Sequence, residues 1–252
     1  MPQPPILVFD VNETLLDLSA LDQPFAAAFG VEMPRAQGIR KAWFTELLHE
    51  ALITTVTGPY VNFAALARSA LRVTAERVPE SLADGGMVQI MSAVSKLPPH
   101  DDVEEALDRL ADAGFRMTAL SNGTPNALAA QIEYAGLTTR FEKIASAEHA
   151  GRLKPAPEPY RWMARELNTP PEDLCMVAAH AWDTTGALRA GLQAAFVARP
   201  GKVLSDADPE PQIIGPSLID VADALIRTLE AQPIANSFTP CMSSFSARCI
   251  MA

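Results

Sequence analysis

An apolar run near the start of the chain, Ile6 to Phe9, ends in the carboxylate of Asp10. A short continuous apolar run bounded by Pro and polar residues predicts a strand buried on both faces, as in parallel sheets that helices cover. Ligands of such sheets bind beyond the carboxyl ends of the strands. Because a buried carboxylate is costly unless it is paired or used, Asp10 is the first candidate for a functional residue.

The hydrophobic pattern changes to the period of helices over residues 18–97. Apolar residues recur there at spacings of three and four, for example along 39–52 and 63–71. Gly58-Pro59 and Gly85-Gly86 interrupt the pattern, as expected at breaks between helices. This stretch contains no convincing strand pattern, so we expect a helical insert.

Beyond residue 97 the predicted elements alternate between helix and strand. Strands are predicted over 116–121, 141–146, 174–179 and 194–198. Helical patterns cover 101–113, which Asp101-Asp102 is expected to cap, the stretch up to 135, 157–167, 183–190 and 217–230. Such alternation is typical of a doubly wound parallel sheet. We therefore expect an α/β fold with a Rossmann-like core from residues 1–17 and 98–231, an inserted α-helical cap domain from 18–97, and a loosely ordered tail over 232–252.

The amino-acid composition indicates which kinds of molecule this protein can bind. The 252 residues are 48% hydrophobic and 20% charged, and their formal net charge is −10. Phosphate binding needs a basic surface, so nucleic acid is a poor partner for this chain. No apolar run reaches the roughly 18 residues of a membrane helix, and no basic segment of the secretory type precedes the first strand. With three cysteines that show no metal-binding spacing, these features indicate a cytoplasmic protein without membrane partners.

Polar residues follow the predicted strands at four places, and parallel strands bring them to one edge of the sheet. They are Asp10, Ser121 with Asn122, Lys154, and Asp183. Together they offer a nucleophilic carboxylate, a hydroxyl, a cation and a second carboxylate. Each also has a plain structural interpretation: a turn hydroxyl for Ser121, a solvated loop lysine for Lys154, and a helix N-cap for Asp183.

The order of these residues resembles the four motifs of the haloacid dehalogenase superfamily. The motifs are Asp10-Val11-Asn12-Glu13-Thr14-Leu15, Leu120-Ser121-Asn122-Gly123, Lys154-Pro155 and Trp182-Asp183, with a helical insert after the first. The Ser-Asn-Gly, Lys-Pro-x-Pro-x-x-Tyr and Ala-Trp-Asp patterns are closer to the (S)-2-haloacid dehalogenase branch. This resemblance implies a hydrolase that cleaves the carbon–halogen bond of a short 2-haloacid, a 2-haloalkanoate, through an ester on Asp10.

The resemblance also implies roles for single residues. Lys154 would keep Asp10 ionised, and Asp183 would orient or activate water. Thr14 and Ser121 would donate hydroxyls to carboxylate oxygens. The other members of the implied site are Asn122 and Trp182 in a halide cradle and Tyr160 in the lysine motif. No metal or organic cofactor is implied, and related enzymes are often dimers, so a homodimer is one assembly to test.

Asn12 separates two activities within the superfamily. Phosphatase members carry at this position a second Asp, which protonates the leaving alcohol as a general acid. An amide has no proton of suitable pKa to give, whereas a halide leaves as a stable anion. Asn12 therefore favours the dehalogenase over the alternative, a magnesium-dependent phosphatase with Asp10 and Asp183 as metal ligands. Asn12 could also be a plain turn residue.

The expected pocket departs from the family pattern. Phe44 follows Trp43 where the family has Arg, and Arg40 either substitutes for that Arg or is a solvated surface charge. His180 replaces an Asn and is either a general base or a hydrogen-bond donor of the pocket wall. With Phe63, and with Ala178 in place of a hydroxyl, the pocket is more apolar. A third alternative is therefore a small-molecule-binding relative that has lost turnover.

Overall fold

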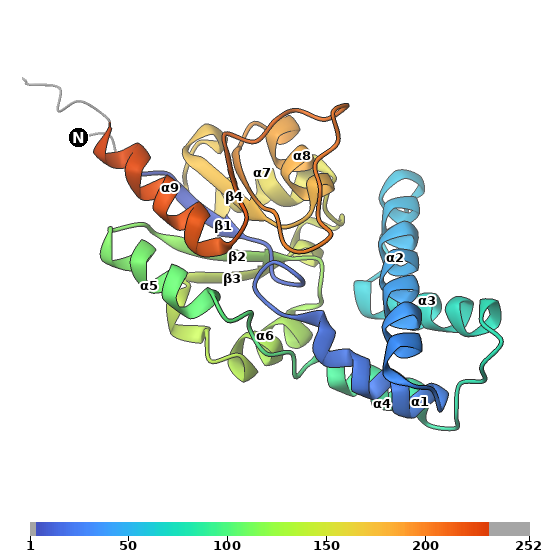
Figure 1. Cartoon of the computed structure of the whole chain (residues 1–252). Coiled ribbons are helices and arrows are strands. Elements are labelled where there is room, and N and C mark those ends of the chain that lie inside the picture. Colours follow the sequence, from blue (N-terminus) through green and yellow to red (C-terminus); the bar gives the residue numbers. More distant parts are fainter. Residues whose placement is uncertain (1–3, 232–252) are drawn as a thin grey trace, which may run out of the picture.

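The computed structural model describes residues 4–231, and the predicted tail over 232–252 lies outside the described residues. Six parallel strands form one sheet in the order β3-β2-β1-β4-β5-β6 (Figure 1). The strands are β1 (Ile6–Phe9), β2 (Met117–Ser121), β3 (Lys143–Ser146), β4 (Leu174–Ala178), β5 (Gln193–Val197) and β6 (Ile213–Gly215). The predicted α/β fold with a parallel sheet is confirmed.

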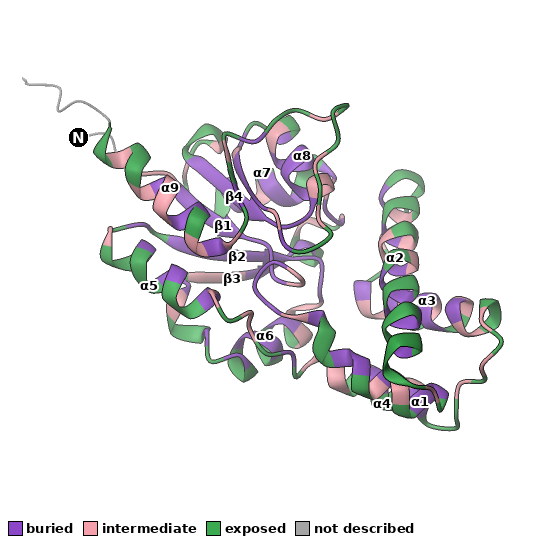
Figure 2. Ribbon diagram, in the orientation of Figure 1, coloured by how far each residue is buried: buried purple, intermediate pink, exposed green. Residues whose placement is uncertain are grey.

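The alternation of side chains along β1 explains why helices cover both faces of the sheet. Leu7 and Phe9 belong to one buried cluster and Ile6 and Val8 to another, since successive side chains of a strand point to opposite faces. The first cluster includes residues of α5 (Val103–Asp112), α6 (Pro125–Tyr134) and α9 (Leu218–Glu230), and the second includes residues of α7 (Pro157–Glu166) and α8 (Ala181–Ala190). Figure 2 shows the strands β1, β2 and β4 as buried, and these strands consist of buried residues throughout.

The helical insert forms a separate layer of helices to one side of the sheet (Figure 1). Its elements are η1 (Leu18–Leu21), α1 (Asp22–Phe29), α2 (Met33–Thr57), α3 (Phe63–Arg77) and α4 (Gly86–Val94). Trp43 anchors this layer: its ring lies 5.5 Å from that of Phe25, and its Nε1 donates to the carbonyl of Ala67 at 2.9 Å. None of the described helices combines the length and apolarity needed to cross a membrane.

The structure differs from the sequence-based expectation at several element ends. A sixth strand, β6, was not expected, because its three residues are too few to show the hydrophobic pattern of a strand. Helix α8 begins at Ala181, so His180 and not Asp183 occupies the N-cap position. The side chain of Asp102 does not cap α5; it accepts hydrogen bonds from Arg199 and from the backbone of Leu218 instead. The remaining short 3-10 helices are η2 (Thr138–Arg140), η3 (Ala147–Ala150) and η4 (Pro171–Asp173).

Candidate active site

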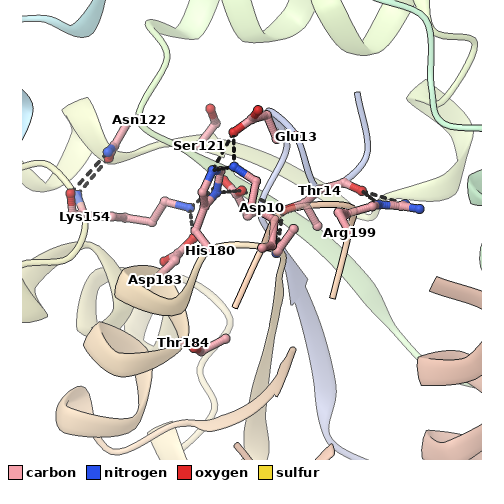
Figure 3. Close-up of polar contacts among 12 residues, drawn as sticks. Asp10, Glu13, Thr14, Ser121, Asn122, Lys154, His180, Asp183, Thr184 and Arg199 are labelled. Carbon is pink, nitrogen blue, oxygen red and sulfur yellow. Dashed lines mark hydrogen bonds and ion pairs between the residues drawn. The ribbon is translucent and has the colours of Figure 1, made fainter. Parts of the chain in front are cut away.

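The four polar positions predicted from the sequence converge at the carboxyl edge of the sheet (Figure 3). Asp10 follows β1 directly, and its backbone N–H still pairs with the carbonyl of Val177 in β4 at 3.0 Å. Ser121 ends β2, Lys154 precedes α7, and Asp183 lies in the first turn of α8. The parallel register explains this convergence, because Phe9 is aligned with Ala119 on one side and Val177 on the other.

Lys154 joins the two carboxylates. Its Nζ donates to Asp10 Oδ1 at 2.9 Å, to Asp183 Oδ2 at 2.6 Å and to the carbonyl of Leu120 at 2.8 Å. The side chain is fully buried, so the solvated-loop interpretation is wrong. Burial alone would lower the pKa of Lys154, but the two carboxylates raise it. The ammonium therefore stays charged, and all three of its protons are used.

Asp10 is held ionised by its neighbours. Its Oδ2 accepts from the hydroxyl of Thr14 at 2.7 Å and lies 3.3 Å from Nδ1 of His180. Burial alone would raise the pKa of Asp10, but the charges of Lys154 and His180 hold it well below its usual range. Thr14 is itself fixed, since its oxygen accepts the backbone N–H of Ala179 at 2.9 Å. A buried, ionised carboxylate of this kind is suited to act as a nucleophile.

Asp183 is completely buried behind Lys154. Its Oδ1 accepts from the hydroxyl of Tyr160 at 2.5 Å. Burial and the nearby Asp10 charge raise the pKa of Asp183, against the lowering effect of Lys154. Tyr160 was expected among the substrate-binding residues; instead its side chain is fully buried against α8 and contacts Asp183. Its position indicates that it orients this carboxylate, because Tyr hydroxyls are usually buried only with a partner.

Ser121 and Asn122 shape the loop that carries Lys154. The backbone N–H of Lys154 donates to Asn122 Oδ1 at 2.7 Å, and Asn122 Nδ2 donates to the carbonyl of Lys154 at 3.2 Å. Ser121 Oγ accepts the backbone N–H of Gly123 at 3.1 Å, which matches the turn interpretation. Among the described residues its hydroxyl donates to no carboxylate of the protein, so of the two expected hydroxyl donors only Thr14 bonds one, that of Asp10.

His180 contacts a charged pair that the sequence analysis missed. Its Nε2 lies 2.9 Å from Glu13 Oε2, and Lys202 Nζ forms an ion pair with the same carboxylate. Burial alone would lower the pKa of His180, but the hydrogen bonds with Asp10 and Glu13 raise it. Glu13 stood inside the first motif without an assigned role. Lys202 follows β5, which neighbours β4 in the sheet. Only this strand order could have indicated that Lys202 lies near His180.

A cavity of about 150 Å³ lies between the insert and the loops that follow β1 and β2. Phe44 and Phe63 line it from the helices, and Asn12 lines it from the core. Arg68 of α3 is the only charged side chain among the described residues that line it, and sequence reasoning missed it. Arg40 does not line this cavity: its side chain is buried and its Nε bonds Asp22 at 2.5 Å. Both expectations for Arg40, surface charge and pocket residue, are therefore wrong.

A second, much smaller space lies beside Lys154. It measures about 10 Å³, close to the least that admits one water molecule, and Asn122, Lys154 and Trp182 contribute to its lining. The indole Nε1 of Trp182 is buried and has no hydrogen-bond partner among the described residues. The ring of Trp182 stacks on that of His180 at 5.2 Å. An unpartnered buried donor is costly, so a bound acceptor would satisfy it.

The two carboxylates do not fit a magnesium site of the phosphatase type. Each of their four oxygens accepts a hydrogen bond from a protein donor: Lys154 and Thr14 for Asp10, and Lys154 and Tyr160 for Asp183. An ammonium already bridges the two carboxylates, so a divalent cation between them would have to displace it. Asn12 adds a neutral oxygen, and that oxygen accepts from Gln131 Nε2 at 3.1 Å.

A parallel sheet with helices on both faces, a helical insert after β1 and four motif residues at one edge define a capped α/β hydrolytic enzyme. The model of the haloacid dehalogenase-like hydrolase family matches residues 5–191, and the chain belongs to this family of hydrolases. The (S)-2-haloacid dehalogenase of Pseudomonas putida is 25% identical over 224 residues, which cover 89% of this chain and 97% of the relative.

Solved structures show the same fold. The L-2-haloacid dehalogenase from Xanthobacter autotrophicus matches with a TM-score of 0.81 at 24% identity, covering 92% of this chain and 100% of that one. A dehalogenase crystal structure with an intermediate complex also matches with a TM-score of 0.81, at 25% identity, covering 90% of this chain and 99% of that one.

Proposed function

We propose that this protein hydrolyses the carbon–halogen bond of a short 2-haloacid through an ester on Asp10. One observation carries the proposal: Asp10 is held ionised, while the residue two positions later, Asn12, presents an amide whose oxygen is fixed by Gln131. The site thus combines a carboxylate nucleophile with no acid at the leaving-group position. A halide needs no proton to leave, whereas an alcohol does.

The first step is a displacement at the halogen-bearing carbon. A carboxylate oxygen of Asp10 forms a bond to that carbon, the carbon–halogen bond breaks, and its electron pair leaves with the halide. Lys154 and Thr14 hold the carboxylate in one orientation, since they bond different oxygens. The small space lined by Asn122 and Trp182, with its unpartnered indole N–H, would receive the halide.

The second step releases the product. Water attacks the ester carbonyl of Asp10, the bond between that carbonyl carbon and the substrate oxygen breaks, and the 2-hydroxyacid leaves. Asp183 or His180 takes a proton from water: His180 contacts Asp10 directly, and Lys154 joins Asp183 to Asp10. In the main cavity Arg68 would bind the substrate carboxylate, and Phe44 and Phe63 its apolar part. Ser121, whose Oγ bonds the backbone of the lining residue Gly123, would bind the same carboxylate from the core.

The relatives support this proposal. The Pseudomonas putida relative is a named (S)-2-haloacid dehalogenase and aligns over nearly its whole length. The dehalogenase structure with an intermediate complex shares the fold at 25% identity. These likenesses favour carbon–halogen hydrolysis over phosphate-ester hydrolysis, in agreement with Asn12.

The proposal is tested by halide release from 2-chloropropionate and fluoroacetate, with and without EDTA. The wild type is expected to release halide in both conditions, and Asp10→Asn is expected to release none, because an amide is not a nucleophile of this kind. Asp206→Asn, the same change at an exposed position, is the matched control and should match the wild type. Phosphate release from a generic phosphate ester that EDTA abolishes, without halide release, would show a phosphatase instead.

A further inference from the structure

Four charged groups form a continuous chain from the nucleophile to the rim of the site. Asp10 faces Nδ1 of His180 at 3.3 Å, Nε2 of the same ring faces Glu13 at 2.9 Å, and Lys202 pairs with Glu13. The ring is 5% exposed and the side chains of Glu13 and Lys202 are 19% and 23% exposed. An imidazole that faces a carboxylate at each nitrogen satisfies both only when it carries both protons.

The backbone at Glu13 indicates that this arrangement is specific. Its φ is 63°, a left-handed conformation that is strained for a residue with a side chain. The turn still satisfies its backbone, since the N–H of Glu13 donates to the carbonyl of Leu16 at 2.9 Å. This conformation accompanies the contact between the carboxylate of Glu13 and His180, and such strain concentrates at functional sites.

We propose that Glu13 is the positioning residue of ester hydrolysis: it holds His180 toward Asp10, and formation of the Asp10 ester converts His180 from an imidazolium into the base that activates water. This inference rests on the proposed dehalogenase function. It assigns to Glu13 and Lys202 a role that the four sequence motifs do not include.

The charges around His180 explain the conversion. In the free enzyme the ring faces two negative groups, Asp10 and Glu13, and one positive group, Lys202, so the protonated ring is favoured. The rings of Phe44, at 6.1 Å, and Trp182, at 5.2 Å, cover it, and the charges of Lys154 and Asp183 lie beyond, paired with each other. When Asp10 becomes an ester, Glu13 and Lys202 balance each other, and burial then favours the neutral ring.

The protons balance over one turnover. Ester formation releases halide, and His180 then loses its Nδ1 proton to solvent water while Nε2 keeps its proton toward Glu13, which leaves Nδ1 with a free lone pair. Attacking water gives a proton to Nδ1 as its oxygen bonds the ester carbonyl carbon. The ring passes that proton to the departing alkoxide, and the acid proton of the regenerated Asp10 returns to the ring. Haloacid and water thus give hydroxyacid, halide and one proton.

Two variants move the pH dependence of ester hydrolysis in opposite directions. Glu13→Gln removes a negative charge, so the apparent pKa of the hydrolysis step is expected to fall by about one unit, and Lys202→Met should raise it by about one unit. In Glu13→Gln the Asp10 ester forms but is hydrolysed about tenfold or more slowly, because the ring is no longer held. Rapid quenching and intact-mass measurement of the ester after mixing with 2-chloropropionate give both rates.

Glu104→Gln and Lys41→Met, at exposed positions, are the matched controls and should behave as the wild type. Unchanged ester hydrolysis in Glu13→Gln, a shift of both variants in the same direction, or failure of a folded Glu13→Gln protein to form the ester would each overturn the inference. If Glu13→Gln does not fold, the upward shift in Lys202→Met decides alone. A wild type that forms no ester and releases no halide would instead overturn the proposed function, and this inference with it.

Discussion

The site contains several buried charged side chains, and a specific partner offsets the desolvation cost of each. A buried ammonium such as that of Lys154 is stable only when its protons are all accepted, and here two carboxylates and a carbonyl accept them. Removing one partner would leave an uncompensated buried charge. The residues of the site therefore depend on one another, and their substitutions are not expected to be additive.

Arg68 provides the residue-scale test of substrate binding. As the only charged side chain that lines the main cavity among the described residues, it is expected to pair with the substrate carboxylate. Arg68→Met should raise the KM for 2-chloropropionate about five- to tenfold with little change in kcat, since a charged hydrogen bond contributes roughly 1.5–3 kcal/mol and exposure weakens it. Steady-state kinetics measure the effect.

Two comparisons make the Arg68 test specific. Arg72→Met changes an exposed Arg one turn further along α3 that does not line the cavity, and its KM should equal that of the wild type. A neutral substrate, 2-chloropropionamide, should be turned over equally by Arg68→Met and the wild type. An equal loss with the acid and the amide would assign Arg68 to the structure of the cavity and not to charge recognition.

The sequence predicted which motif residues meet at this edge, but not all of their contacts. Asp10, Lys154 and Asp183 follow strands whose order could be anticipated, so their convergence was predictable. Glu13, Lys202 and Arg68 were missed, because a charge in a loop or on a helix carries no periodic signal. The predictions for Arg40 were wrong because its partner, Asp22, lies on another helix, and the sequence does not show that the two side chains meet.

At the scale of elements, the close packing of α8 fixes Asp183. Gly186 of this helix lies against the loop of Lys154 and against Tyr160: a Cβ there would be 2.6 Å from Pro155 Cβ and 2.7 Å from the Tyr160 hydroxyl. Both distances are shorter than any real contact. The glycine therefore allows α8 to approach the loop closely enough for Lys154 to reach Asp183.

Gly186→Ala is expected to lower both stability and activity. Overpacking of this kind costs about 1–3 kcal/mol, which corresponds to a fall in Tm of roughly 2–10 °C for a chain of this size. Halide release should fall more than stability predicts, because α8 or the Pro155 loop must move and both carry site residues. Thermal denaturation and kcat are the measurements.

The matched control for this change is Gly38→Ala in α2. A Cβ at Gly38 meets nothing within 4 Å, and alanine is the better helix former, so this variant should be as stable as the wild type or more stable. A Gly186→Ala protein with unchanged Tm and kcat would contradict the assigned packing of α8.

The sequence predicted the type and approximate position of most helices and strands, but it did not predict the residues at which they begin and end. All strands but the last were predicted, and continuous apolar runs indicated β1 and β4 most directly, because these strands are buried on both faces. The start of α8 was placed two residues late, since neither His180 nor Asp183 caps the helix with its side chain. The contacts of Asp102 depend on the ends of α5 and α9 meeting in space, which local sequence does not encode.

At the scale of the whole molecule, the main cavity lies where the helical insert meets the core, so the shape of this cavity depends on how these parts are joined. The extents predicted for the core and cap, residues 1–17 with 98–231 and 18–97, remain predictions. Gln131 is among the polar side chains that connect the parts: from α6 it donates to Asn12 at 3.1 Å and to the carbonyl of Val94, the last residue of α4, at 2.9 Å.

Gln131→Leu tests this connection. The change keeps the approximate volume of the side chain but leaves the Val94 carbonyl and the Asn12 amide oxygen without their donor, so the free energy of unfolding should fall by about 1–3 kcal/mol. Because Asn12 lines the cavity, KM for 2-chloropropionate should also rise, whereas a purely local loss of stability would leave KM unchanged. Urea denaturation and steady-state kinetics separate the two. Gln89→Leu, at an exposed position of α4, is the control, and a Gln131→Leu protein indistinguishable from it would show that this contact does not hold the insert to the core.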